Sequence, residues 1–138
     1  MTIIVTDTGF GPDTWTEGYC GAGAANDCPA LDLASDADPM AITLTPALRM
    51  IRVDFPSSAD GRGFTIARTL RQRGYQGRLR ARGHVLADQY AMARRAGFDE
   101  VEIPQALAAR QPEDQWLFRA DWQAHDYQAR LRGTAPAT

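Results

Sequence analysis

The stretch Ile51-Arg52-Val53-Asp54-Phe55 alternates apolar and charged side chains, and two later stretches repeat the alternation, Arg78-Leu79-Arg80-Ala81-Arg82 and Glu100-Val101-Glu102-Ile103. A period of two is typical of a β-strand with one dry and one polar face. The stretches are separated by two segments with apolar stripes, from about residue 62 to 73 and from about 85 to 96, which end at Gly74 and Gly97. The sequence therefore predicts a β-α-β-α-β unit with parallel strands.

The alternation also predicts which faces of this sheet are covered. A doubly wound sheet has helices on both faces and continuously apolar strands. Here we expect an α/β fold in which a small, mostly parallel sheet of βαβ units carries its helices mainly on one face, singly wound or half-barrel-like. The other face is then a solvated surface, a barrel-like interior lined with ion pairs, or a surface that a partner covers. Its predicted residues are Arg52, Asp54, Arg78, Arg80, Arg82, Glu100 and Glu102.

If the three strands lie side by side in their order along the chain, the arginine-rich strand over residues 78–82 lies between two strands that carry acids. Arg80 then lies between Asp54 and Glu102. These arginines can form cross-strand ion pairs that contribute roughly 0.2–1 kcal/mol each to stability. In that case they serve the fold and not a binding or catalytic function.

The flanking segments give weaker signals. Residues 2–6 and 30–34 fit buried strands, and residues 9–29, with five glycines, fit a loop. Asp38 and Pro39 fit the start of a short helix that reaches about Leu48. Helices are expected to begin at Pro104 and Pro112. A last helix over residues 113–132 is expected to dock across the domain, with a tail at residues 134–138.

The charge is distributed unevenly along the 138 residues, which suffice for one domain, residues 1–138. Residues 1–48 hold seven acids and no basic residue, whereas residues 61–95 hold nine arginines and one acid. A nucleic-acid interface is one interpretation of this segment. We favour ion pairing or protein docking instead, because much of the charge alternates along a strand beside acids.

The composition also bears on the compartment and on the cysteines. Apolar runs of a few residues argue against a membrane span, and the first ten residues do not resemble a signal peptide, so a cytoplasmic protein is expected. In that reducing compartment Cys20 and Cys28 are expected to be free thiols. Their spacing is unlike that of zinc-binding pairs, and neither a metal site nor a cofactor is predicted.

The segment Asp60-Gly61-Arg62-Gly63 is a candidate anion- or partner-binding site, because it leads from a strand into a helix. Free amides and the helix dipole attract anions at such a point, and Arg80 and Arg82 can add guanidinium groups. Alternatively, Asp60 caps the helix and the glycines permit the turn. The dinucleotide-binding fingerprint is not matched, because Ile66 replaces its third glycine.

A second candidate site follows the second strand. α/β proteins often place their chemistry at the carboxyl ends of strands. His84 stands there, with Asp88 and Gln89 close behind it, and these three are the candidate catalytic residues. His84 can act as a general base or cap the following helix, and the residues leave that choice open.

Several motifs within residues 51–103 together resemble a bacterial domain-of-unknown-function family, number 934. They are Phe55-Pro56, Asp60-Gly61-Arg62-Gly63-Phe64, Ala67-Arg68, Leu70-Arg71, Gly77-x-Leu79-Arg80-Ala81, Gly83-x-Val85-Leu86-x-Asp88-Gln89 and Gly97-Phe98-Asp99. Members are described, from gene neighbourhood, as oxidoreductases involved in sulfite reduction, encoded beside the haemoprotein subunit of assimilatory sulfite reductase. The sequence departs from the family at Ala96, where many members carry Cys, and at His84, where an acid is common.

The resemblance implies an accessory protein of assimilatory sulfite or sulfate reduction. Such a protein would bind a sulfite reductase subunit or another redox protein through the charged sheet face and the arginine-rich loops. An open polar sheet face also favours self-association. Two alternatives remain: a small enzyme or oxyanion-binding protein with its site at the carboxyl ends of the strands, and a nucleic-acid-binding module. Whether the protein catalyses a reaction stays open.

Overall fold

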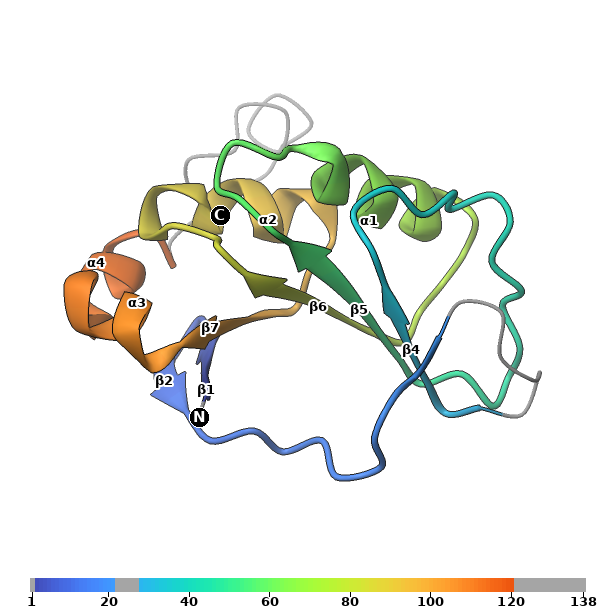
Figure 1. The fold of residues 1–138 in the computed structure, drawn as a ribbon, viewed down its shortest axis with the longest axis horizontal. Helices are drawn as coiled ribbons and strands as arrows, with labels where there is room; N and C mark the ends of the chain where they lie inside the picture. The colour runs from blue at the N-terminus through green and yellow to red at the C-terminus, as the bar shows by residue number, and fades with distance from the viewer. Residues whose placement is uncertain (1, 22–27, 121–138) are drawn as a thin grey trace, which may run out of the picture.

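The computed structural model describes residues 2–21 and 28–120, which form a seven-stranded sheet with helices packed on it (Figure 1). The strand order is β2-β1-β7-β6-β5-β4-β3. Strands β3 to β7 are parallel to one another, whereas β1 is antiparallel to β7 and β2 to β1. The predicted α/β class is thereby confirmed. The strands are β1 (Thr2–Thr6), β2 (Gly9–Gly11), β3 (Cys20–Gly21), β4 (Ala30–Leu33), β5 (Met50–Phe55), β6 (Arg78–Gly83) and β7 (Glu100–Pro104).

The predicted β-α-β-α-β unit is confirmed as β5-α1-β6-α2-β7. Helix α1 (Arg62–Gln72) is followed by Gly74 at a φ of 97°, and α2 (Tyr90–Ala96) by Gly97 at a φ of 120°. Both glycines hold the left-handed conformation that commonly ends a helix. A short 3-10 turn, η1 (Ala87–Gln89), precedes α2 and accounts for the first part of the second predicted helix.

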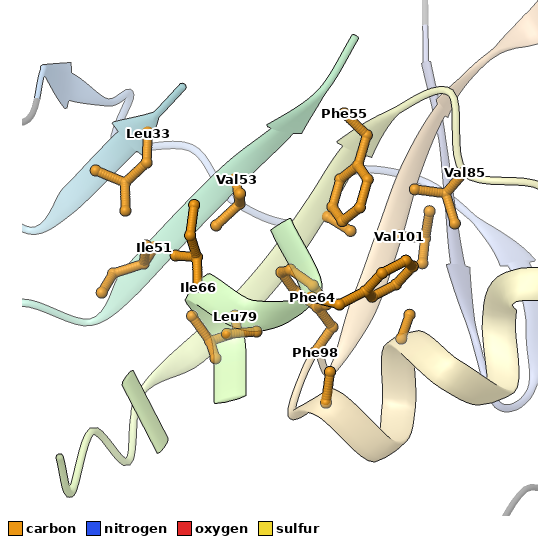
Figure 2. Close-up of a cluster of buried hydrophobic side chains, with 14 of the residues drawn as sticks. Leu33, Ile51, Val53, Phe55, Phe64, Ile66, Leu79, Val85, Phe98 and Val101 are labelled. Atoms are coloured by element: carbon orange, nitrogen blue, oxygen red, sulfur yellow. The ribbon is translucent and has the colours of Figure 1, made fainter. Parts of the chain in front are cut away.

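The core lies between the sheet and the two helices. Alternate residues of the strands, such as Ile51, Val53 and Leu79, point into it and have no exposed surface. Figure 2 shows them with Phe55 and Phe64, whose ring centroids are 5.0 Å apart. A register slip of one residue would turn charged side chains into this core, so its burial fixes which face is polar. The helices contribute Gly63, Phe64, Ile66, Ala67, Leu70, Tyr90, Ala93 and Ala96.

The helix predicted over residues 38–48 is absent, so that prediction is wrong. Asp38 closes a turn instead, because its carboxylate accepts a hydrogen bond from the amide of Met40. Arg73, just after α1, donates to the carbonyl oxygens of Pro39 and Ile42. Tertiary contacts thus occupy carbonyls that a helix would need for its own hydrogen bonds.

Two further helices begin where proline predicted them, α3 (Gln105–Arg110) after Pro104 and α4 (Glu113–Phe118) after Pro112. Trp116 anchors α4: its ring is buried edge-on against Tyr90, and its Nε1 donates to the carbonyl of Gln111. Helix α4 ends earlier than predicted. The expected continuation from residue 121 to 132 and the tail at 134–138 lie outside the described residues.

The segment predicted to be a loop, residues 9–29, contains the short strands β2 and β3. Between them, residues 12–19 run along the side of the sheet opposite α1 and α2 (Figure 1). We call this segment the strap. It lies on the polar face, so the chain itself covers part of the surface that the strand pattern left open.

Candidate functional site

The polar face of the sheet is organised around Arg80, whose side chain has no exposed surface. Its Nε donates to the carboxylate of Glu100, and its Nη1 donates to Glu102 at 3.1 Å. Its Nη2 donates to Asp13 of the strap at 3.0 Å. Three carboxylates thus enclose one guanidinium, and both glutamates are buried as well. Arg80 is therefore a fixed part of the interior and is not free to bind a ligand.

Ion pairs continue from Arg80 into β5. Arg52 pairs with Asp32 of β4 at 2.7 Å and with Glu102 at 3.1 Å. Arg52 and Arg80 lie directly opposite each other in the parallel register. Their repulsion is offset because both donate to Glu102 Oε1, which joins β5, β6 and β7 through one carboxylate.

The expected position of Arg80 between Asp54 and Glu102 is wrong for Asp54. The register of β5 and β6 places Asp54 opposite Arg82, and that pair is 3.3 Å apart. The order of the strands along the chain does not reveal this offset, because the long crossover connections between parallel strands do not fix their register.

The strap closes the polar face from outside. The Tyr19 ring lies over the guanidinium of Arg52, with 3.8 Å between the guanidinium carbon and the ring centroid. Trp15 lies within cation–π distance of both Arg49 and Arg78. Around Arg80, Glu100 and Glu102 the structure shows an interior lined with ion pairs and covered by a segment of the same chain, whereas the side chains of Asp54 and Arg82 of the predicted face stay partly exposed at its edge.

Protonation equilibria reflect this enclosure. Burial alone would raise the pKa of Asp13, but hydrogen bonds from Arg80 and from the amide of Trp15 outweigh it and lower that pKa. Burial alone would lower the pKa of Arg80, but Asp13 and Glu100 outweigh it and raise that pKa. Burial raises the pKa of Tyr19. The ion pair between strap and sheet therefore stays charged at neutral pH.

The expectation that Cys20 and Cys28 are free thiols is wrong, because the two residues form a disulfide. Pairing of β3 with β4 returns the chain onto itself and places their Cα atoms 6.5 Å apart, within the range that a disulfide spans. The disulfide joins Cys20, which directly follows the strap, to Cys28, two residues before β4.

A cavity of about 340 Å³ opens at the carboxyl ends of β5, β6 and β7. His84 lines it, beside Arg82, Asp54 and Glu102, and the amide of His84 donates to the carbonyl of Phe55 at 2.9 Å. The side chains of His84 and Arg82 are exposed. The structure thus brings two of the predicted site residues, His84 and Arg82, together at this edge.

The Asp60 segment lies at the same edge but does not line that cavity. The Asp60 carboxylate accepts hydrogen bonds from the amide and the guanidinium of Arg62, and these bonds lower its pKa far below the ordinary value. Arg62 also donates to Ser35, which follows β4. Gly63 is buried, and a Cβ there would overlap the ring of Phe55, so its packing requires glycine.

The side chains of Asp88 and Gln89 form contacts outside the cavity that His84 lines. The Gln89 side chain accepts from the amide of Leu86 and donates to the carbonyl of Ser58, which ties together the loops that follow β5 and β6. Asp88 pairs with Arg119 at 3.0 Å on the surface. The structure therefore does not bring the three candidate catalytic residues His84, Asp88 and Gln89 into one cavity.

Sequence reasoning missed Asp13, Asp32 and Tyr19, which complete the polar face from outside the alternating strands. The one signal for the two aspartates was the excess of acids in the first third of the chain, which complements the arginines that follow. Within residues 2–21 and 28–120, no group of three or more His, Cys, Asp or Glu side chains is arranged to hold a metal ion. No helix in this part of the chain is long and apolar enough to cross a membrane.

The fold and this face define a small, singly wound α/β protein in which the sheet's polar side is closed by ion pairs. The chain belongs to a bacterial family: its residues 30–138 match the family described as "Bacterial protein of unknown function (DUF934)". This confirms the family predicted from the central motifs. The strap and both cysteines precede the matched residues. No curated protein and no solved structure matches the chain.

Proposed function

We propose that this protein is an accessory protein of assimilatory sulfite reduction, and that it binds a sulfite reductase subunit or another redox protein through the carboxyl edge of its sheet. We define this carboxyl-edge surface by Pro56, Arg62, Arg82 and His84, all of which are exposed. The pathway rests on the family resemblance, since members are encoded beside the sulfite reductase haemoprotein.

One observation carries the choice of surface. Arg80 is enclosed by carboxylates of its own chain, whereas the side chains of Arg62 and Arg82 keep 61% and 46% of their surface exposed at the edge. The guanidinium N–H groups that Asp60, Ser35 and Asp54 leave open can donate charge-assisted hydrogen bonds to carboxylates of a partner. The sequence suggested both the charged sheet face and the arginine-rich loops for docking, and we retain only the loops at the ends of the strands.

The edge arginines are also held in place before a partner arrives. Asp60 and Ser35 fix Arg62, and Asp54 fixes Arg82. Side chains that are already ordered lose less entropy on binding. This arrangement favours recognition of an acidic protein surface.

The test is binding of the purified protein to the haemoprotein subunit of sulfite reductase from the same cell. We expect Arg62→Glu and Arg82→Glu each to weaken binding by about tenfold or more, with an affinity that falls as salt rises. Arg68→Glu is the matched control, because Arg68 is an exposed arginine on the outer side of α1. Wild-type protein that binds neither this subunit nor another redox protein of the cell, or edge variants that bind like the control, would overturn the proposal.

The cavity beside His84 favours one second candidate, a small oxyanion site of an enzyme or a carrier. Asp54 and Glu102 line the cavity itself and would repel an anion enclosed there, whereas a partner surface would meet Arg62 and Arg82 from outside, and we therefore place this candidate second. Titration of sulfite into the protein, followed by the NMR signals of the His84 ring, decides this point. Saturable shifts that Arg82→Gln abolishes would support the site, and unchanged signals at millimolar sulfite would exclude it.

A further inference from the structure

The strap is anchored at its two ends by different means. At its start, β2 pairs with β1 over three residue pairs. At its other end, β3 pairs with β4 over only two, Cys20 with Leu31 and Gly21 with Asp32. The Cys20–Cys28 disulfide reinforces this second, weaker end. It is therefore the covalent fastening of the segment that covers Arg80.

Between these ends the strap is held by side chains. Within the described part of the chain, no backbone-to-backbone hydrogen bond joins residues 12–19 to the sheet. The contacts are the Asp13–Arg80 and Glu17–Arg49 ion pairs, a hydrogen bond from Arg78 to the Thr14 hydroxyl, and the rings of Trp15 and Tyr19 on arginines. Segments held by few, partly exposed contacts are those that open locally at low free-energy cost.

We propose that the Cys20–Cys28 disulfide is a redox-active site that a protein dithiol reduces, and that its reduction releases the strap from Arg80. Cys20 is the more exposed of the two residues, so the attacking thiolate forms a mixed disulfide with its Sγ and the Cys28 sulfur leaves as a thiolate. The second thiol of the donor then displaces Cys20. The donor is oxidised to a disulfide, and the protein gains two electrons and two protons.

Release changes what the polar face presents. Arg80 loses the carboxylate of Asp13, and Arg52 loses the ring of Tyr19, while the glutamates of β7 remain in place. The closed face thereby becomes an open one under reducing conditions. This inference goes beyond the proposed function, because it concerns the chain alone and its test contains no partner.

Chymotrypsin cleavage tests the release, because Trp15 and Tyr19 lie in the strap and the exposed Phe118 provides an internal control outside it. The probe for the donor is dithiothreitol in native buffer, followed by removal of the reductant and alkylation of the thiols. The Cys20→Ser/Cys28→Ser double variant repeats the measurement without any reductant. Mass spectrometry counts the alkylated cysteines and follows each cleavage.

We expect native dithiothreitol to expose both thiols, and cleavage after Trp15 to become about tenfold faster or more in the reduced protein and in the double variant. Cleavage after Phe118 should keep its rate. A disulfide that is reduced only in denaturant, or strap cleavage unchanged by reduction, would overturn the proposal. Faster cleavage after the buried Phe64 as well would also overturn it, since the disulfide would then support the whole fold.

Discussion

Arg80 Nη1 and Glu102 Oε1 lie 3.1 Å apart in the interior, on neighbouring strands of the sheet's polar face. The two residues belong to a buried ion-pair network. The alternation of charged residues along the strands fits such a network and a solvated surface equally well. Breaking a buried pair from one side leaves a charge without compensation. The network therefore contributes to stability in a way that single substitutions can measure.

Replacement of Arg80 by methionine tests this first. The variant keeps the length of the side chain but leaves Glu100 and Glu102 buried with fewer partners. We expect Arg80→Met to lower the free energy of unfolding by about 3–5 kcal/mol, measured by urea denaturation. Arg68→Met, on the exposed side of α1, should change it by no more than about 0.5 kcal/mol. An Arg80→Met protein as stable as the control would show that the glutamates reach water.

The pH dependence of stability should report the strap. The folded protein lowers the pKa of Asp13 below its ordinary value of 3.8, so this carboxylate stabilises the fold above that pH. The contribution is lost as pH falls through the lowered pKa. Asp13→Asn should therefore be less stable than wild type at pH 6, and the difference should vanish in the acid range. Urea midpoints across this pH range measure it.

Asp114→Asn is the matched control for that series, because Asp114 is exposed on α4, away from the strap. Its pH profile should follow that of wild type. An Asp13→Asn profile that runs parallel to wild type at every pH would contradict the assignment of Asp13 as the linked group.

Sequence patterns predicted the central fold because strand-like and helix-like patterns of apolar residues alternate along this part of the chain. Period two marks β5, β6 and β7, and Gly74 and Gly97 end the helices between them. The same patterns assigned Arg80 to the polar face. They could not show that it is buried, because Asp13 reaches it from 67 residues away in the chain.

Two failures have the same physical origin. The helix expected over residues 38–48 lost to hydrogen bonds from Arg73, and the cysteine pairing depended on where β3 meets β4. Both are set by contacts distant in sequence, which local propensity does not contain. The Asp60–Gly63 segment was predicted correctly as a turn into a helix, while the reason for Gly63 became visible only from the position of Phe55.

Arg71 offers a test of a residue that the family motifs include. Its guanidinium donates to the carbonyl oxygens of Gly97, Tyr75 and Gly77 and to the carboxylate of Asp99. A lysine has its three donors at one point and cannot reach all of these acceptors. We expect Arg71→Lys to cost about 1–3 kcal/mol in urea denaturation. Arg68→Lys should be neutral, and equal stability of both variants would mean that water satisfies the carbonyls.

Gly61 and Gly63 separate the packing role of a glycine from a ligand-binding one. A Cβ at Gly61 meets nothing within 4 Å, whereas a Cβ at Gly63 would overlap the Phe55 ring. Alanine usually stabilises a helix by about 1 kcal/mol relative to glycine. We nevertheless expect Gly63→Ala to lower the free energy of unfolding by about 1–3 kcal/mol, because the ring must move within a packed core. Gly61→Ala should lower it by less than about 1 kcal/mol, because Gly61 is the N-cap residue of α1, where alanine is less favourable than glycine.

Phe55→Leu makes room for the added methyl, so the Phe55→Leu/Gly63→Ala double variant should lose less stability than the sum of the losses of the single variants. Strict additivity, or a Gly63→Ala protein as stable as wild type, would remove the packing explanation and return Gly63 to the list of candidate binding residues.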